Sequence, residues 1–409
     1  MDADIRTVTA DEYPAFARSV ESAFGTQPSD EEVSDWRSVV ELDRTLAAFD
    51  DGEIVGTAGA YSFRQTVPGG ASIPVAGVTA VSVRSTHRRR GLLRAMMDRQ
   101  LDDVAARGEP VAILTASESV IYGRFGYGLA TSEAALAIDP ARSEFRRPLD
   151  DHGSVRLLSA EDARRELPAV HERARQQVPG DITRSDAWWD LRVKDPEYRR
   201  QGASAAFFAS HRSATGETDG WLIYRVRPAW KHGLPNNTVE VHELGATDPT
   251  AEVALWRLVL DIDLVSEVVA WGRPLDEPLR WWLADPRRLR VTAIKDDIWV
   301  RLLDIPAALS ARRYDLEGEV VFEVEDRFRP QLSGRYRLEG GPDGASCTAT
   351  DASADLSIDV ADLGAAYLGR PCFRSFAAAA RVEEHRDGAL RRADLMFGTG
   401  RVPFCRTGF

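Results

Sequence analysis

Hydrophobic positions in the first 140 residues alternate between a period of two and a period of three to four, which predicts strands interleaved with helices. Short β-branched runs favour strands, whereas apolar residues repeated every three or four positions form one face of a helix. The predicted elements are a helix over 10–24, strands over 45–49, 54–63, 75–83 and 111–115, and a helix that begins after residue 90. A helix between two strands indicates a βαβ unit with parallel neighbouring strands.

A polar, proline-containing stretch near residues 140–155 predicts a domain boundary, after which the alternation returns. The second region is expected to repeat the plan of the first, with a helix over 161–177, strands over 221–226 and 238–244, and a helix over 250–259. From about residue 301 the pattern becomes a small α+β unit, with strands over 320–324, 335–338 and 356–360 and helices over 361–368 and 377–380. We therefore expect three domains of mixed α/β and α+β class, over 1–145, 146–300 and 301–409.

The loop after the strand over 75–83 is the most informative stretch of the chain. It places Arg88 and Arg89 beside Gly91, and the following helix repeats apolar residues on one face, namely Leu93, Met97, Leu101 and Val104. A helix start binds anions through its unpaired N–H groups and its positive dipole end, and a glycine lets the backbone approach a ligand closely. The pattern predicts a pyrophosphate site, with an exposed arginine-rich helix start as the alternative. It matches neither a Walker loop nor a dinucleotide-binding fingerprint.

A second polar stretch follows the strand over 111–115 and carries three glycines and two tyrosines between Tyr122 and Gly128. Ligands in open α/β sheets bind beyond the carboxyl ends of parallel strands, so we expect this stretch to face the anion site. Group transfer at a carbonyl carbon requires a base for the nucleophile, a hydrogen-bond donor for the oxyanion and an acid for the leaving group. A phenol, with a pKa of about 10, can be that acid. Tyr122 and Tyr127 are both candidates, with packing beneath the loop as the alternative for each.

Composition narrows the class of protein. The 409 residues include 12 more acidic than basic ones, which argues against a general nucleic-acid binder and suits a cationic substrate, although acidity kept for solubility explains it equally well. We find neither an apolar run that could span a membrane nor a signal peptide pattern. Cys347, Cys372 and Cys405 lack a metal-type spacing, so we expect reduced thiols, no metal and a cytoplasmic protein.

Two motifs give the chain a family resemblance. Arg88-x-x-Gly91 resembles the coenzyme A loop of the GCN5-related N-acetyltransferases, with Leu93 in place of the usual small residue. The segments 116–118 and 121–128 resemble those of the actinobacterial Eis (enhanced intracellular survival) proteins, and the similarity extends in outline over the whole chain. The resemblance implies an N-terminal acetyltransferase domain, a degenerate second copy and a C-terminal domain similar to sterol carrier proteins.

The same resemblance implies an acetyl-CoA-dependent enzyme that acetylates several amines of aminoglycoside antibiotics, an antibiotic-resistance activity, and that assembles as a homohexamer. It assigns Tyr122 as the general acid and the C-terminal carboxylate of Phe409 as the general base. Without the resemblance the terminus would be expected to fray, and its carboxylate is a weak base at pH 7. Phe24 and Trp36 stand where the family has acceptor-pocket aromatics, with core packing as the alternative. The implied coenzyme contacts are Val81, Val83, Arg88, Arg89, Gly91, Leu92 and Ser117.

Two rival hypotheses remain open at the level of sequence. One keeps acetyl-CoA but makes protein lysine or a polyamine the acceptor, and parallel assays of antibiotics and peptide amines would separate it from the first. The other is a non-catalytic sensor that binds acyl-CoA or lipid, suggested by the C-terminal domain. The presence of the Tyr122 motif and of Phe409 argues against this sensor.

Overall fold

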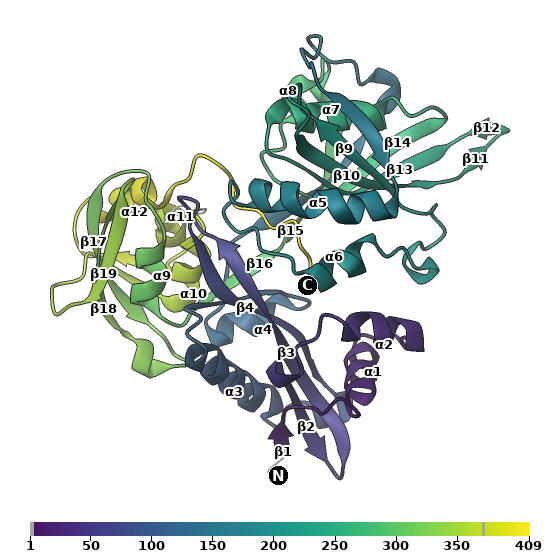
Figure 1. The fold of residues 1–409 in the computed structure, drawn as a ribbon. Helices are drawn as coiled ribbons and strands as arrows, with labels where there is room; N and C mark the ends of the chain where they lie inside the picture. Colours follow the sequence, from purple (N-terminus) through teal and green to yellow (C-terminus); the bar gives the residue numbers. More distant parts are fainter. Residues whose placement is uncertain (1–3, 370–372) are drawn as a thin grey trace. The chain divides into compact units, whose positions relative to one another are not determined.

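The computed structural model describes residues 4–369 and 373–409, and the chain forms two compact units (Figure 1). The first unit contains residues 1–131, 296–400 and 407–409, and the second contains residues 132–295 and 401–406. Cys347 and Cys405 are buried, and Cys372 lies outside the described residues. Within the described part of the chain, we find no helix with the length and apolar character needed to cross a bilayer.

A seven-stranded sheet in the order β1-β2-β3-β4-β5-β16-β6 organises the first unit. Its strands are β1 (Asp4–Arg6), β2 (Thr45–Asp50), β3 (Glu53–Thr66), β4 (Ser72–Val83), β5 (Val111–Thr115), β16 (Ile298–Leu302) and β6 (Gly128–Leu129). The helices beside it are α1 (Tyr13–Ala23), α2 (Asp30–Arg37), α3 (Leu92–Ala106) and α4 (Ser119–Tyr122). Strand β5 pairs parallel to β4 across α3, which is the predicted βαβ unit.

The two faces of this sheet pack against different helices. Ala47 packs with Tyr13 and Phe16 of α1, whereas its neighbour Ala48 packs with Met96 of α3. Successive side chains of a strand point to opposite faces, so α1 and α3 cover opposite sides of the sheet, as Figure 1 also shows. The carboxyl ends of the inner strands β4 and β5, which lead into the candidate loops, therefore lie between two helical layers.

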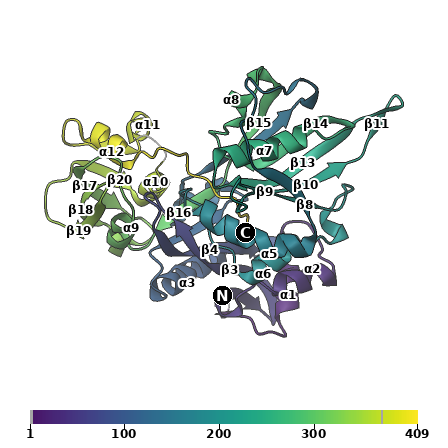
Figure 2. The same cartoon turned by 45° about the horizontal axis from the view of Figure 1, so that its top comes forward.

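The second unit repeats this plan. Its sheet has the order β15-β7-β14-β13-β10-β9-β8, with α5 and α7 on opposite faces (Figure 2). The strands are β7 (Ser132–Ile138), β8 (Ser154–Leu158), β9 (Phe207–Arg212), β10 (Thr218–Arg227), β13 (Asn237–Ala246), β14 (Val265–Arg273) and β15 (Leu289–Asp296), with a separate hairpin of β11 (Trp230–Lys231) and β12 (Leu234–Pro235). The helices are α5 (Ala160–Arg175), α6 (Asp186–Val193), α7 (Pro249–Leu260) and α8 (Leu279–Trp282). Strands β13 and β14 are parallel across α7.

Two strands do not follow the expected boundaries at residues 145 and 300. Strand β7 precedes residue 145 but pairs with β14 in the sheet of the second unit. Strand β16 contains Val300, which pairs with Ile113 of β5 and with Gly128 of β6 in the sheet of the first unit. Local periodicity identifies a strand but does not name its partner, so a boundary drawn from composition misses this exchange.

The C-terminal region forms a five-stranded sheet in the order β19-β18-β17-β20-β21 and belongs to the first unit. Its strands are β17 (Gly318–Glu325), β18 (Gly334–Gly341), β19 (Gly344–Ala349), β20 (Leu356–Asp359) and β21 (Val382–Glu384). Its helices are α9 (Ile305–Ala311), α10 (Val360–Ala366), α11 (Phe373–Ala378) and α12 (Ala389–Phe397). The predicted α+β pattern is present, but the helices α9 and α12 and the strands β19 and β21 were not predicted.

Candidate active site

The candidate site lies where β4 and β5 separate. Their parallel ladder ends at the pair Val78 and Leu114, whereas β4 continues to Val83. Past this point Ala80 adopts a left-handed backbone with φ of 53°, and the pairing of β4 with β3 shifts register. Two cavities open along the separated part of β4. We call the cavity lined by Arg88, Arg89 and Gly91 the helix-start cavity. We call the cavity lined by Phe24 and Trp36 the aromatic cavity.

A buried threonine on β3 supports the irregular part of β4. Thr57 donates a hydrogen bond of 2.7 Å from its hydroxyl to the carbonyl of Ala80 and lies 2.7 Å from the hydroxyl of Ser82. The side chain therefore satisfies a carbonyl next to the register shift. Ala80 lines the aromatic cavity and Ser82 lines the helix-start cavity, so one residue holds the backbone of both.

The helix-start cavity has a volume of about 690 Å³ and ends at the start of α3. Gly91 precedes α3 with φ of 84°, a conformation that favours glycine. The first turn of α3, all of it described, has no acidic side chain, so its N–H groups and dipole favour an anion. All seven residues expected to contact a coenzyme line this cavity, namely Val81, Val83, Arg88, Arg89, Gly91, Leu92 and Ser117.

The arginines of this loop divide into two groups. Arg84 pairs with Glu53 at 3.3 Å, and Arg90 bonds to the carbonyl of Thr86 at 3.0 Å. Arg88 and Arg89 are exposed and have no ion pair within residues 4–369 and 373–409. These two guanidinium groups remain available to an anionic ligand. The donor set fits a pyrophosphate group.

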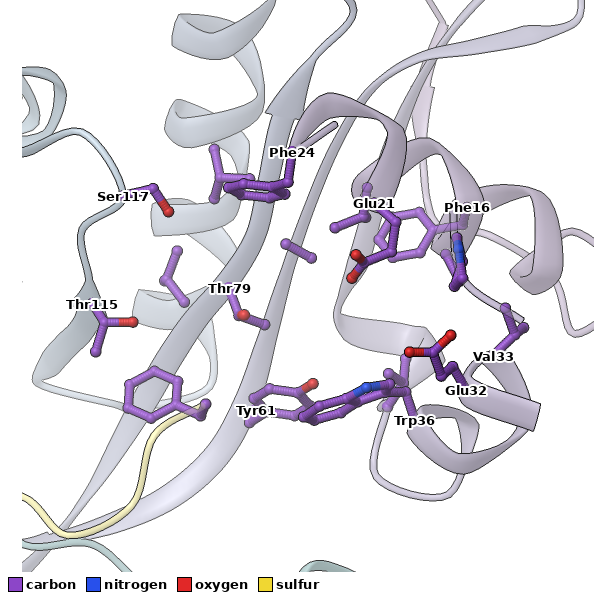
Figure 3. A pocket seen from close by; sticks show the side chains of 18 of the residues that line it. Phe16, Glu21, Phe24, Glu32, Val33, Trp36, Tyr61, Thr79, Thr115 and Ser117 are labelled. Atoms are coloured by element: carbon purple, nitrogen blue, oxygen red, sulfur yellow. The ribbon is translucent and has the colours of Figure 1, made fainter. Parts of the chain in front are cut away.

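The aromatic cavity has a volume of about 420 Å³ and lies between α1, α2, β3 and β4 (Figure 3). Phe24 and Trp36 both line it, and their exposed fractions of 53% and 37% show that neither is packed in the core. Glu21 on α1 and Glu32 on α2 both line the cavity, and Figure 3 shows Glu32 beside Trp36 and Glu21 beside Phe16. None of the described lining residues is Lys, Arg or His, so the charge of the cavity suits a cation.

Tyr122 stands where the two cavities meet. Four residues line both of them, namely Phe24, Val81, Ser117 and Tyr122. The Tyr122 side chain is 8% exposed, and burial together with the negative charge of Glu118 raises the pKa of its phenol. A phenol with a raised pKa stays protonated at neutral pH and can donate its proton. Tyr127, the other candidate, is fully buried, and its hydroxyl points at Met97 Sδ, 4.0 Å away.

The end of the chain is packed, which differs from the frayed terminus that local sequence alone would suggest. Phe409 lines the aromatic cavity and contacts the ring of Phe63. Within the second unit, Phe404 donates its N–H to the carbonyl of Pro179 at 2.9 Å, and Arg406 forms an ion pair with buried Asp181. Burial and hydrogen bonding therefore hold the last residues.

Sequence reasoning missed most residues of the aromatic cavity, among them Glu21, Glu32 and Tyr61. The sequence does contain a signal for the helix that carries Glu32. Ser29 and Glu32 form a capping box, in which the Ser29 N–H donates to the Glu32 carboxylate at 2.7 Å and the Glu32 N–H donates to the Ser29 hydroxyl at 3.2 Å. A serine followed three residues later by glutamate marks a helix start, and it would have located α2.

Comparisons with known proteins cover the whole chain. Residues 4–130 and 180–302 match two acetyltransferase (GNAT) domain families, and residues 305–406 match the sterol carrier protein domain family. The chain is 45% identical to an uncharacterized N-acetyltransferase of Streptomyces avermitilis, with 100% of both chains covered. It is 36% identical to the N-acetyltransferase Eis of Mycobacterium tuberculosis over 96% of both chains.

A solved structure is also similar to this chain over nearly its whole length. The crystal structure of Eis1 from Mycobacterium abscessus has a TM-score of 0.87 and 37% identity to this chain, and the match covers 99% of this chain and 100% of that one. Together with the domain matches, this confirms the expected order of two acetyltransferase-like domains followed by a sterol-carrier-like domain.

Proposed function

The chain belongs to the Eis family of GCN5-related N-acetyltransferases, and from this premise we propose that it acetylates amines of aminoglycoside antibiotics with acetyl-CoA as the acyl donor. The observation that carries the proposal is the junction of the two cavities at Tyr122. One cavity presents helix N–H groups and arginines, and the other presents carboxylates and aromatic rings. A donor and an acceptor of opposite charge can therefore meet at one phenol.

The helix-start cavity is the proposed site of acetyl-CoA. The N–H groups at the start of α3, with Arg88 and Arg89, would hold its pyrophosphate, and the separated backbone of β4 from Val81 to Val83 would bind its pantetheine arm. When bound, acetyl-CoA supplies an acetyl group activated as a thioester. Ser117 lines the cavity opposite β4 and can donate or accept one further hydrogen bond there.

The aromatic cavity is the proposed site of the acceptor. Aminoglycosides carry several ammonium groups on saturated sugar rings. Glu21 and Glu32 would attract the ammonium groups, and Phe24 and Trp36 would stack on the rings or on a neighbouring cation.

Two groups of this chain would move the protons. The carboxylate of Phe409 would take one proton from the acceptor ammonium, and the neutral amine would then attack the acetyl carbon. As the carbon–sulfur bond breaks and the amide forms, the nitrogen would lose its second proton. Tyr122 would donate its phenolic proton to the departing thiolate. The second proton lost by the nitrogen would restore the phenol of Tyr122, and the proton held by the Phe409 carboxylate would pass to solvent, so both groups of the chain end unchanged.

A direct test incubates the purified full-length protein with acetyl-CoA and kanamycin-type antibiotics, a lysine peptide or a polyamine, and counts transferred acetyl groups by mass spectrometry. We expect multiple acetylation of the antibiotics at a higher kcat/KM than that of the other amines. A preference for the peptide or the polyamine would reject the antibiotic as the substrate class. Binding of acetyl-CoA without transfer to any amine would favour the sensor.

The resemblance also supports two further proposals. We propose that the protein acts in the cytoplasm, where acetyl-CoA is made, and that it assembles as a homohexamer. Light scattering at micromolar concentration tests the assembly, and a monomer would refute it.

A further inference from the structure

The loop that carries Tyr122 rests on a residue of the sterol-carrier-like domain. Phe125, three residues after Tyr122, meets Phe328 edge to face with 5.0 Å between the ring centroids. Both rings are buried in one hydrophobic cluster that also contains Tyr122 and Tyr127. The cluster also includes Met97, Leu101 and Val104 of α3, so the loop, the helix and Phe328 share one core.

The segment around Phe328 is held rigidly. Asp326 accepts the N–H groups of Phe328 and Arg329 at 3.1 and 2.9 Å and forms an ion pair with Arg301 of β16. The Asp326 and Arg301 side chains are both fully buried. A fully buried pair with additional hydrogen bonds fixes the geometry of its segment, because any displacement leaves a charge unpaired.

The same segment also contacts α3, whose start forms the helix-start cavity. Arg329 donates to the carbonyl of Asp98 at 2.6 Å and pairs with Asp102 at 2.9 Å. The guanidinium of Arg94 lies over the Phe328 ring, 5.1 Å from its centroid. Residues 326–329 therefore connect the Tyr122 loop to the helix proposed to bind pyrophosphate.

The glycines of the loop have a packing explanation that sequence reasoning did not give. A Cβ atom at Gly126, where φ is 82°, would lie 2.3 Å from Nη1 of Arg301. A Cβ atom at Gly128 would lie 1.6 Å from the carbonyl oxygen of Ala361 in α10. Gly128 needs glycine because α10 of the C-terminal domain approaches the loop backbone closely. Gly126 needs it because of its left-handed backbone and its close contacts with Arg301 of β16 and Val360 of α10. Neither residue lines the two cavities, so their role is to let the loop dock.

We propose that Phe328 of the sterol-carrier-like domain is a positioning residue, which holds the Tyr122 phenol at the junction of the two cavities through its contact with Phe125. This inference rests on the proposed function, in which Tyr122 is the general acid. Removing the Phe328 ring leaves a void beneath Phe125 into which the loop can relax. A displacement of about 1 Å at a reacting group can cost about 10²-fold in rate.

The test is a double-mutant cycle on kcat, with each rate divided by the concentration of acetyl-CoA-binding sites found by calorimetry. We expect Phe328→Ala to lower kcat by roughly 10- to 100-fold while the acceptor KM changes less than about threefold. Phe328→Leu, which keeps most of the apolar volume, should restore most of the rate. In a Tyr122→Phe background, Phe328→Ala should cost less than about threefold, because the proton donor it positions is already absent.

A matched variant separates this effect from general destabilisation. Phe322 is a fully buried phenylalanine of the same domain that packs on Phe373 and Phe397. We expect the folded fraction of Phe322→Ala to have near-normal kcat. Equal losses of kcat from Phe328→Ala in the presence and absence of the Tyr122 phenol would overturn the positioning role. If Tyr122→Phe alone kept normal kcat, the proposed acid would fail instead, so the two failures are distinguishable.

Discussion

The ring of Phe409, the last residue of the chain, meets the ring of Phe63 on β3 nearly edge to face, with 5.2 Å between their centroids. Aromatic pairs of this geometry are favourable beyond the area that they bury. The contact places the end of the main chain beside the aromatic cavity, which Phe409 also lines. The position of the C-terminal carboxylate therefore depends on a side-chain contact of its own residue.

Extending the chain by a single alanine after Phe409 should inactivate the enzyme. The added residue moves the carboxylate by up to about 3.5 Å, and misplacement of a reacting group can cost about 10²-fold or more. The measurement is kcat for aminoglycoside acetylation, with an N-terminal extension as the control that should have no effect. Normal turnover by the C-terminally extended protein would remove the carboxylate from the mechanism.

Replacing Tyr122 by phenylalanine should lower kcat by about 10²- to 10⁴-fold, the usual contribution of general acid catalysis. The substitution keeps the ring that packs edge to face on Tyr127, so the fold and the affinity for acetyl-CoA should be retained. Steady-state kinetics with a calorimetric check of acetyl-CoA binding gives both quantities. A variant with near-normal kcat would reject Tyr122 as the acid.

The activity should persist to high pH and depend on Glu118. Burial and the charge of Glu118 both raise the pKa of Tyr122, so the phenol remains protonated above the pH at which a free tyrosine ionises. Glu118→Gln removes the negative charge, lowers this pKa and should move the alkaline limb of the kcat profile to lower pH. Profiles of the two proteins between pH 7 and 11 make the comparison. A limb that moves to higher pH would contradict the assignment.

Substituting both Arg88 and Arg89 by alanine should weaken acetyl-CoA binding by on the order of 10²-fold, because each charge-assisted hydrogen bond contributes about 1.5–3 kcal/mol before solvent screening. Arg90→Ala is the matched control, since Arg90 bonds to the Thr86 carbonyl and is not among the residues that line the cavity. Titration calorimetry should give one site per chain for the wild type. Two sites, or equal losses in the control, would contradict the assignment of the helix-start cavity.

The carboxylates of the aromatic cavity should set the KM for charged acceptors. Glu21→Gln and Glu32→Gln should each raise the KM for a multiply charged aminoglycoside by roughly 3- to 10-fold with little change in kcat, and added salt should shrink the difference. Glutamine at position 32 can keep the capping box of α2, so the helix should remain. Glu31→Gln on the same helix is the control. A fall in kcat at unchanged KM would place these residues elsewhere in the reaction.

The sequence predicted those parts of the fold in which the elements that pack together also follow one another along the chain. Strand β4, helix α3 and strand β5 follow one another, and the apolar face of α3 was read correctly because Met97, Leu101 and Val104 are all buried. Helix α2 was missed because its eight residues are mostly polar, and packing of Val33 rather than an apolar stripe stabilises it. The partner of β16 could not be predicted, because Ile298 pairs with Thr115 and the segment 132–295 lies between these two residues in the sequence.

The candidate site likewise contains residues that contiguous motifs predicted and residues from separate segments that the sequence did not reveal. The seven residues expected to contact the coenzyme come from two short motifs, and all of them line one cavity. The aromatic cavity draws instead on separate segments. Glu21, Glu32 and Tyr61 come from three elements whose approach is decided by packing on the sheet, and no local pattern records that approach.

The exchange of β7 and β16 between the two sheets sets an order of events during synthesis. When residue 131 leaves the ribosome, β5 still lacks the strand that lies beside it in the finished sheet, and that strand follows the entire segment 132–295. Until β16 is made, β5 remains an edge strand with unpaired backbone groups. Other unfinished chains can pair with such an edge. The N-terminal sheet is therefore prone to aggregation while residues 132–295 are being translated. A fragment that ends near residue 145 lacks β16, so its β5 would keep this unpaired edge.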